Sequence, residues 1–390
     1  MQRSEEPNTQ PYRYELVDLF CGCGGASAGF MATGAFRHLY AADVDPWACL
    51  TYRRNLGHQA EVRDLRELVT EDESWAAGLT AKASMPVVLF GGPPCQGFSS
   101  HVKMKGDRHD RNTLVSVFGQ LAVALRPTHV VMENVPDLVS DRWWPVFCEL
   151  RETLLEAGYY VRARIVNFAQ LGVPQERFRL VMLASLDRPL TFPEVRRHGT
   201  AEFSTVKESI GHLQPVSSGE VDPLDPMHEA SKHRASTLEI IRQVPLDGGS
   251  RPAGVGPECL RRARDAYGGY TDVYGRLAWS ETAPTITARC RTPSCGRFVH
   301  PEQLRGLTAR EAGLLQTFPD DWFFEGPFDD RFKQIGNAVP PLAMQTIAEH
   351  LVTGSASGTD EIGLFEVKDR PVGASFSVLI PGIRRRGGVL

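Results

Sequence analysis

A cysteine stands at residue 95 in the stretch LFGGPPCQGFSS, directly after an apolar run and two prolines. The apolar residues before Gly91 predict a buried strand, and the glycine pair that follows predicts a sharp turn. Cys95 is therefore expected at the carboxyl end of a strand, the edge of an open α/β sheet where ligands bind. A thiol at that edge is placed to act as a nucleophile, although a single cysteine is by default a small buried hydrophobe.

Other chemically capable residues follow other apolar runs. Glu133 ends the run HVVMEN, and a buried carboxyl with a raised pKa can donate a proton at neutral pH. QERFR carries Arg177 and Arg179, which strand alternation places on one face, where guanidinium groups can hold a carbonyl oxygen or a phosphate. Each of these charged residues alone is typical of an ordinary ion pair. A thiol, an acid and arginines at one sheet edge suit covalent catalysis on an electron-poor ring.

The segment DLFCGCGGASAGF (18–30) predicts a glycine turn between a strand and a helix. Gly22, Gly24 and Gly25 form GxGG, which differs from the dinucleotide fingerprint GxGxxG and disfavours a nicotinamide oxidoreductase. Glycines let the backbone approach a ligand, and a helix N-terminus offers unpaired amide groups. Asp43 ends the next apolar run, where it is placed for ribose hydroxyls. The turn and this acid together predict a nucleotide site.

Strands and helices alternate from residue 14 to about residue 185. Apolar runs predict strands at 14–20, 38–43, 86–91 and 129–134, and helical patterns fall at 26–33, 46–55, 113–125 and 144–157. YYVRARIVNF and FRLVMLAS then predict an antiparallel pair of strands. This alternation predicts an α/β fold with a mostly parallel sheet that is covered on both faces.

The rest of the chain differs in kind. Residues 187–285 are rich in Pro, Gly, Ser and Arg and have weak periodicity, which predicts a second, loop-rich domain. Further on, Thr308 and Glu311 predict a capping box, and 340–352 predicts a closing helix. TGSASGTD (353–360) predicts a flexible linker to a tail in which VGASFSVLI has the pattern of a strand.

Composition bounds the class of protein. With 390 residues, 42% of them hydrophobic, the chain can bury a large core. Eight scattered cysteines and an N-terminus without an apolar signal region predict free thiols in a reducing cytoplasm, and no cysteine spacing predicts a metal site. No apolar run is long enough to cross a bilayer. The net charge of the chain is −4, but residues 225–310 contain 13 Lys+Arg and 9 Asp+Glu. This modestly basic region could bind a phosphate backbone, and it is equally typical of an ordinary solvated surface.

Taken in order, these motifs resemble the DNA cytosine-5 methyltransferases. The glycine turn, PPCQGFS, ENV, QERFR, LQTFPD and QIGNAVPP occur between about residues 16 and 351. The resemblance implies a Rossmann-like S-adenosylmethionine-dependent methyltransferase sheet with a smaller loop-rich target-recognition domain. It also implies S-adenosyl-L-methionine as methyl donor and double-stranded DNA as partner. The catalytic residues that it implies are Cys95, Glu133, Arg179 and Arg177, and cofactor-contacting positions fall on Phe20, Gly22, Gly25, Asp43, Val44, Asp64, Leu65, Pro94, Leu114, Asn337 and Val339.

The family chemistry gives each residue a role. Cys95 adds to carbon 6 of cytosine, Glu133 acts at N3, and an arginine, best Arg179, holds O2. The target base has to leave the duplex, and the polar loop 101–112 is suited to close over the DNA. Many relatives have an aromatic residue over the adenine where this chain has Val44.

Two alternatives to DNA methylation remain open at this stage. The same chemistry on RNA is disfavoured by the size of the recognition segment, because reading base edges in a groove needs such a module. A catalytically dead DNA-binding protein is disfavoured because Cys95, Glu133 and Arg179 are all present.

The resemblance also suggests a division of the chain. We expect a catalytic domain at 1–186, a target-recognition domain at 187–325, a helix returning to the catalytic domain at 326–352, and a linker and tail at 353–390. Because the tail lies beyond the resemblance, truncation at about residue 354 is expected to leave catalysis intact. We expect a cytoplasmic, nucleoid-associated monomer of prokaryotic or phage-like origin, which acts alone or beside a cognate restriction endonuclease.

Overall fold

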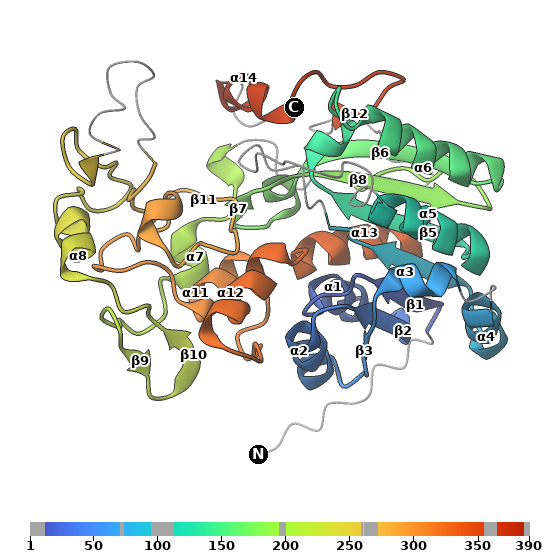
Figure 1. The fold of residues 1–390 in the computed structure, drawn as a ribbon, viewed down its shortest axis with the longest axis horizontal. Helices are drawn as coiled ribbons and strands as arrows, with labels where there is room; N and C mark the ends of the chain where they lie inside the picture. Colours follow the sequence, from blue (N-terminus) through green and yellow to red (C-terminus); the bar gives the residue numbers. More distant parts are fainter. Residues whose placement is uncertain are drawn as a thin grey trace. The chain divides into compact units, whose positions relative to one another are not determined.

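The computed structural model describes residues 12–70, 74–94, 113–194, 200–258, 260, 272–354 and 365–385. The chain forms two compact units, and each of them is assembled from separate stretches of sequence (Figure 1). Unit 1 comprises Met1–Val166, Phe178–Val195 and Pro341–Leu390, and unit 2 comprises Asn167–Arg177 and Arg196–Pro340. Among the described residues, no helix is long and apolar enough to cross a membrane.

Unit 1 is built on a mixed sheet of eight described strands in the order β12-β6-β8-β5-β4-β1-β2-β3. These strands are β1 (Tyr14–Leu19), β2 (Phe36–Asp43), β3 (Glu61–Val62), β4 (Val87–Gly91), β5 (His129–Asn134), β6 (Tyr160–Asn167), β8 (Phe178–Ser185) and β12 (Phe365–Glu366). The strands from β3 to β5 pair in parallel, whereas β8 is antiparallel to β5 and β12 is antiparallel to β6. The predicted α/β fold with a mostly parallel sheet is confirmed.

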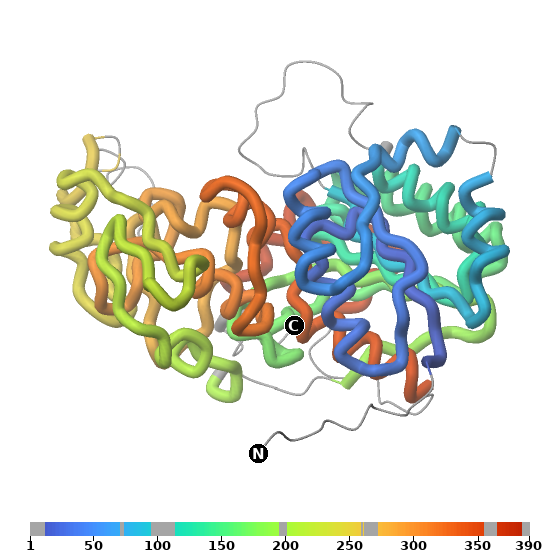
Figure 2. The backbone as a smooth tube through the Cα atoms, turned by 90° about the horizontal axis from the view of Figure 1, so that it is seen from below, coloured from blue at the N-terminus to red at the C-terminus, as the bar shows by residue number. Residues whose placement is uncertain are grey.

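The helices of unit 1 follow the predicted pattern with small differences in their ends. They are α1 (Gly25–Ala32), α2 (Pro46–Leu56), α3 (Leu65–Val69), α4 (Ser74–Lys82), α5 (Thr113–Leu125), η1 (Pro136–Val139), α6 (Trp144–Glu156), α13 (Pro341–Thr353), η5 (Phe376–Val378) and α14 (Ile380–Arg385). α3, α4 and α6 all contact α5, whereas α1 packs against α13. α13, which comes late in the sequence, therefore lies beside the helix that follows the first strand, and its path can be followed in Figure 2.

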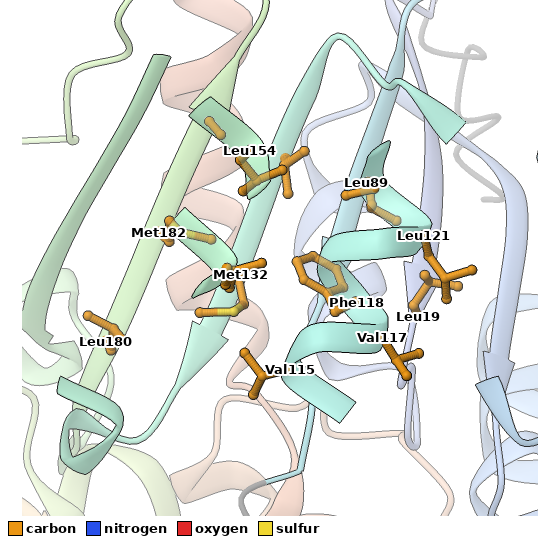
Figure 3. Packing of buried hydrophobic residues seen from close by; sticks show 14 of the residues in the cluster. Leu19, Leu89, Val115, Val117, Phe118, Leu121, Met132, Leu154, Leu180 and Met182 are labelled. Atoms are coloured by element: carbon orange, nitrogen blue, oxygen red, sulfur yellow. The ribbon is translucent and has the colours of Figure 1, made fainter. Parts of the chain in front are cut away.

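The main core lies between α5, α6 and the sheet (Figure 3). Phe118 and Leu121 on α5 are buried together with Leu89 on β4, Met132 on β5 and Met182 on β8. Burial of apolar side chains such as these is the main favourable term in folding, about 1.5–3 kcal/mol for each large one. This layer therefore holds together β4, which precedes Cys95 in the sequence, β5, which carries Glu133, and β8, which carries Arg179.

β4 is apolar at successive positions because both of its faces are covered. Phe90 lies against Phe30 of α1, with ring centroids 5.9 Å apart, while Leu89 belongs to the core beside α5. A side chain at Gly91 would meet the ring of Phe118, since an added Cβ would lie 2.3 Å from it. Glycine at the end of β4 therefore permits the close approach of α5.

Unit 2 consists of short elements joined by loops, as predicted for its central part. Its described elements are η2 (Phe168–Leu171), β7 (Gln175–Glu176), η3 (Thr200–Glu202), α7 (Val206–Ile210), β9 (Val221–Asp222), β10 (Asp225–Glu229), α8 (Ala235–Arg242), β11 (Ala283–Pro284), η4 (Pro293–Cys295), α11 (Ala309–Leu315) and α12 (Phe328–Asn337). The predicted capping box is confirmed: Thr308 accepts a hydrogen bond from the Glu311 amide, and Glu311 accepts one from the Thr308 amide.

Buried arginines organise the loops of unit 2. The guanidinium of Arg276 donates hydrogen bonds to the carbonyl oxygens of Ile241, Val244, His300 and Gln303. Carbonyl groups in buried loops need donors, and one guanidinium supplies several of them in a fixed geometry. Part of the arginine surplus in this region therefore serves the fold and is not available to bind phosphate.

One of these arginines neutralises a buried acid. Arg305 donates to Glu311 at 2.7 and 2.8 Å, and both side chains are fully buried. Burial alone raises the pKa of Glu311, but Arg305 outweighs it and lowers the pKa to about 2. The N-terminus of α11 is thus held by a charged pair as well as by its capping box.

The C-terminal tail differs from its prediction. VGASFSVLI (372–380) contains the 3₁₀ helix η5 and the first residue of α14 but no strand, so the prediction of a strand there was wrong. Phe376 and Ile383 are each 1% exposed in the main core, and Ile380 packs against it. Their spacing of four and three residues is helical, which the alternation of shorter side chains in the sequence concealed. The described tail is an integral part of unit 1.

The two compact units do not follow the boundaries drawn from the sequence. Residues 167–177 and 326–340 belong to unit 2, whereas 187–195 and the described tail belong to unit 1. The assignment of a catalytic and a target-recognition domain to these units stays a prediction.

Because α1 and α13 lie in close contact, we expect a methyl group added at Gly29 to destabilise the fold. A Cβ at Gly29 would lie 2.2 Å from the Pro341 carbonyl oxygen and 2.7 Å from the Gln345 amide nitrogen, both backbone atoms. We expect Gly29→Ala to lower the free energy of unfolding by about 1–3 kcal/mol, as overpacking does. The matched control is Gly78→Ala in α4, where nothing lies within 4 Å of the added Cβ and a gain of about 0.5–1 kcal/mol is expected. Urea unfolding followed by circular dichroism measures both, and equal stability of the two variants would contradict the packing argument.

Candidate active site

The glycine turn after β1 is held by the acid at the end of β2. The Gly22 amide donates to Asp43 at 2.9 Å, and the Asp45 amide donates to the other oxygen of the same carboxylate at 2.8 Å. Phe20, Gly22 and Gly24 have positive φ angles of 60°, 51° and 91°. An added Cβ at Gly22 would meet nothing within 4 Å, so there is open space in front of this turn. The parallel pairing of β1 with β2 thus joins the turn and the acid that the sequence predicted as a nucleotide site.

A chain of buried hydrogen bonds lies behind this turn. Asp18 accepts from Ser27 at 2.6 Å, Ser27 lies 2.8 Å from the Tyr52 hydroxyl, and that hydroxyl lies 3.0 Å from His38 Nδ1. Burial raises the pKa of Asp18 to about 7, and the neighbouring charge of Asp43 adds to this effect. This network was not predicted from the sequence, because Ser27, Tyr52 and His38 come from three separate elements.

The other predicted cofactor positions of unit 1 have varied surroundings. Val44 is 67% exposed directly after β2, and Leu65 is buried at the start of α3. Asp64 caps α3 by accepting from the Arg66 amide, and it forms an ion pair with the Arg66 side chain. Pro94 and Leu114 are half-buried, and Gly25 opens α1. Their contacts with a cofactor stay predictions.

Glu133 and Arg179 form a largely buried ion pair. Arg179 Nε lies 2.8 Å from Glu133 Oε1, and the two side chains are only 12% and 10% exposed. Sheet register produces this contact, because Glu133 is paired with Val181 and Arg179 lies two residues before Val181, on the same face. The pairing therefore brings together the acid and one of the two arginines that the sequence selected.

Asn134, which was not among the residues predicted from the sequence, connects β5 with the segment that follows β4. Its side-chain amide donates to the Pro93 carbonyl oxygen at 3.2 Å, and its own oxygen accepts from the Val135 amide at 2.8 Å. The side chain is buried. Asn134 therefore fixes the backbone two residues before Cys95, and the signal that could have identified it is its place beside Glu133 in ENV.

The prediction that Arg177 and Arg179 share a strand face was wrong. β7 ends at residue 176 and β8 begins at residue 178, so Arg177 lies between strands and alternation does not apply to it. Its buried guanidinium donates to the carbonyl oxygens of Ile286 and Ala338 at 3.1 and 2.9 Å. Arg177 therefore connects loops within unit 2, and these contacts provide no support for the predicted catalytic role.

The remaining predicted residues lie in unit 2 or outside the described residues. Asn337 ends α12, and Val339 is buried just after it. Cys95 and the loop 101–112 fall outside the described residues, so their roles stay predictions from the sequence.

Comparison with known proteins identifies the family. Residues 14–353 match the sequence pattern of the C-5 cytosine-specific DNA methylases. The chain belongs to this family. It is therefore a DNA cytosine-5 methyltransferase, and the resemblance seen in its sequence is confirmed.

Two relatives span nearly the same length of chain. The Type II methyltransferase M1.HphI of Haemophilus parahaemolyticus is 36% identical over 337 residues, which cover 85% of each protein. The Type II methylase M.HgiDII of Herpetosiphon aurantiacus is 33% identical over 344 residues, which cover 86% of the methyltransferase described here and 94% of that protein.

Solved structures share the fold. A candidate DNA modification methyltransferase encoded within a prophage (E. coli) has a TM-score of 0.62 at 22% identity, covering 87% of this chain and 99% of its own. A mutant of Spodoptera frugiperda DNMT2 has a TM-score of 0.57 at 15% identity, with the same coverage. These likenesses agree with the α/β sheet of unit 1.

The buried position of Asp18 predicts how stability depends on pH. Because its pKa is raised from 3.8 to about 7, the folded state binds the proton more tightly, and the wild type loses stability as pH rises between those values. Asp18→Asn cannot ionise but still accepts from Ser27. We expect its stability relative to wild type to rise from pH 4 to pH 7, by at most about 4 kcal/mol, and then to level off.

Thermal unfolding across this pH range measures the effect. Asp64→Asn is the control, because Arg66 lowers the pKa of Asp64, and removal of that charge should give no gain at any pH. A stability difference for Asp18→Asn that does not change with pH would contradict the assignment.

Proposed function

We propose that this methyltransferase transfers a methyl group from S-adenosyl-L-methionine to carbon 5 of a cytosine flipped out of a specific double-stranded DNA sequence. The reaction proceeds through a covalent adduct of Cys95 with carbon 6. The observation that best supports this proposal is the ion pair between Glu133 and Arg179, at the sheet edge where β4 leads to Cys95.

The ion pair is complementary to one edge of cytosine. N3 and the exocyclic oxygen O2 lie side by side on this edge. A carboxyl group and a guanidinium group whose atoms are 2.8 Å apart can therefore hydrogen-bond both of them at once. Arg179 donates to O2, and Glu133 protonates or hydrogen-bonds N3. Both interactions draw electrons away from carbon 6 and make it open to attack.

Cys95 supplies the nucleophile in this scheme. Its thiolate adds to carbon 6, and the displaced electrons move toward N3 and O2, so that carbon 5 becomes the nucleophilic carbon of an enamine. After carbon 5 has gained the methyl group, a base removes its proton and the returning electron pair expels the Cys95 thiolate. Asn134 assists by holding the Pro93 carbonyl in place ahead of the nucleophile.

The residues around the glycine turn fit the proposed cofactor. Open space in front of Gly22 provides room, and the N-terminus of α1, which Gly24 does not cap with a side chain, presents amide donors. Asp43 holds the turn through both of its carboxylate oxygens, and because a carboxylate oxygen can accept more than one hydrogen bond, the same group also suits ribose hydroxyls. Exposed Val44 offers an apolar surface to the adenine. When bound, S-adenosyl-L-methionine supplies an electrophilic methyl group.

DNA has to be opened for this chemistry, at a cost of a few kcal/mol for each flipped base. We assign the recognition of the sequence to unit 2 and the closing of the site to the loop 101–112. The Type II names of the relatives suggest a restriction–modification setting with a cognate endonuclease, and we propose that the enzyme acts there as a cytoplasmic, nucleoid-associated monomer.

The covalent step predicts a trapped complex. DNA with 5-fluorocytosine at the target should form an adduct with the wild type that survives denaturing electrophoresis, because fluorine cannot leave as a proton does. Bisulfite sequencing of DNA from expressing cells first provides the target. Cys95→Ser should form no adduct, and Cys148→Ser is the matched control that should trap normally. An adduct that persists in Cys95→Ser would disprove the assignment, and transfer to RNA but not to DNA would overturn the proposed substrate.

The roles of Glu133 and Arg179 predict losses in turnover. We expect Glu133→Gln to lower kcat about 10²–10⁴-fold, the usual contribution of a general acid, and Arg179→Lys to lower it strongly because lysine lacks the planar guanidinium. Steady-state transfer of labelled methyl groups measures both variants. Glu149→Gln, on the exposed part of α6, is a control that should retain wild-type turnover. Near-normal turnover in Glu133→Gln would show that the proton comes from elsewhere.

A further inference from the structure

The C-terminal tail contacts the segment that directly follows Glu133. The Val372 amide donates to the Val139 carbonyl oxygen at 2.9 Å, and the Asp141 amide donates to the Gly373 carbonyl oxygen at 2.9 Å. Ser375 Oγ donates to Asp137 Oδ1 at 2.6 Å. η1, which begins two residues after β5 ends, is therefore held to the tail at both of its ends.

The same tail contacts the strand that carries Arg179. The ring of Phe376 lies 5.5 Å from the ring of Phe178, centroid to centroid, and both side chains are buried. Phe178 and Arg179 are neighbours on β8, so their side chains point to opposite faces of the sheet. Phe376 thus packs behind the position from which Arg179 reaches Glu133.

The tail is also joined to the edge of the sheet. β12 pairs with β6 through Phe365 opposite Ile165, and the Val367 amide donates to the Ala163 carbonyl oxygen at 3.0 Å. Ile383 is buried in the main core. The tail is therefore anchored before and after the residues that contact η1 and Phe178, which allows it to resist displacement of either one.

We propose that residues 365–385 are a positioning segment for the Glu133–Arg179 pair, with Phe376 and Ser375 as its positioning residues. The ion pair is made by side chains from two strands, and a shift of about 1 Å in either strand end would separate its atoms from the cytosine edge. Contacts with η1 limit the movement of Glu133, and the contact with Phe178 limits that of Arg179. This inference rests on the proposed roles of Glu133 and Arg179, and it contradicts the expectation that the tail is dispensable for catalysis.

The test compares single substitutions in the full-length chain. Phe376→Ala removes the ring that packs on Phe178, and Phe376→Leu restores apolar volume. Ser375→Ala removes the hydrogen bond to Asp137 and the N-cap of η5 without opening the core. Val378→Ala is the matched control, because Val378 lies in the same 3₁₀ helix and is 72% exposed. Transfer of labelled methyl groups from S-adenosyl-L-methionine to unmethylated bacterial genomic DNA gives kcat and KM. The assays are made well below the unfolding midpoint of every variant, as measured by circular dichroism.

We expect kcat to fall at least tenfold in Phe376→Ala and about threefold in Ser375→Ala, with KM for cofactor and DNA within twofold of wild type. Phe376→Leu should recover most of the loss, and Val378→Ala should match wild type. The pH profile of kcat provides a second readout. An unfolded fraction lowers kcat by the same factor at every pH, whereas displacement of the ion pair changes the shape of the profile.

The outcomes separate this inference from the proposed function. Folded Phe376→Ala and Ser375→Ala with wild-type kcat and pH profile would overturn the role of the tail while leaving the proposed function in place. A fall in kcat with an unmoved pH profile would also overturn it, since the tail would then act on stability alone. Failure of the wild type to methylate cytosine would instead overturn the proposed function. Should Phe376→Ala not fold, Ser375→Ala decides the question alone, by the same two measurements.

Discussion

The antiparallel pairing of β8 with β5 is the constraint on which the candidate active site depends. β5 also pairs in parallel with β4, so a single strand connects the segment before Cys95, the acid Glu133 and the arginine Arg179. A slip of one residue between β5 and β8 would turn Arg179 to the opposite face and break the ion pair. The apolar layer beneath these strands, with Met132 and Met182 buried side by side in the register, holds that pairing in place.

Buried charges in this protein are accommodated in two different ways. Asp18 lies in unit 1 without a cationic partner among its hydrogen bonds, and burial raises its pKa until it keeps its proton near neutrality. Glu311 in unit 2 stays ionised because Arg305 is beside it. Burying a charge costs several kcal/mol unless it is neutralised or paired, so either solution limits what can replace the residue. The guanidinium groups of Arg276 and Arg177 use the same principle on backbone carbonyls, which gives the loops of unit 2 a defined shape.

Unit 1 is assembled from the beginning, the middle and the end of the chain. α13 packs against α1 so closely that glycine is required at residue 29, and β12 covers β6, which would otherwise be the edge of the sheet. Exposed strand edges invite pairing with other chains, and a short covering strand reduces that hazard. The same tail also contacts η1, which follows β5, and Phe178, at the start of β8. One segment therefore covers the edge of the sheet and supports the ion pair.

The sequence by itself determined the features that depend on neighbouring residues. The four strands predicted before residue 135, the capping box at Thr308 and the family motifs are encoded locally, and the structure and the comparisons confirmed them. Only the tertiary structure separated Arg177 from Arg179, because the break between β7 and β8 depends on pairing with distant strands. It also decided that η5 and α14 form in the tail with Phe376 and Ile383 buried, since Phe376 contacts a core more than 190 residues earlier in the chain, at Phe178. Local propensity is weak beside such burial, and a short segment adopts the conformation that places its apolar side chains in the core.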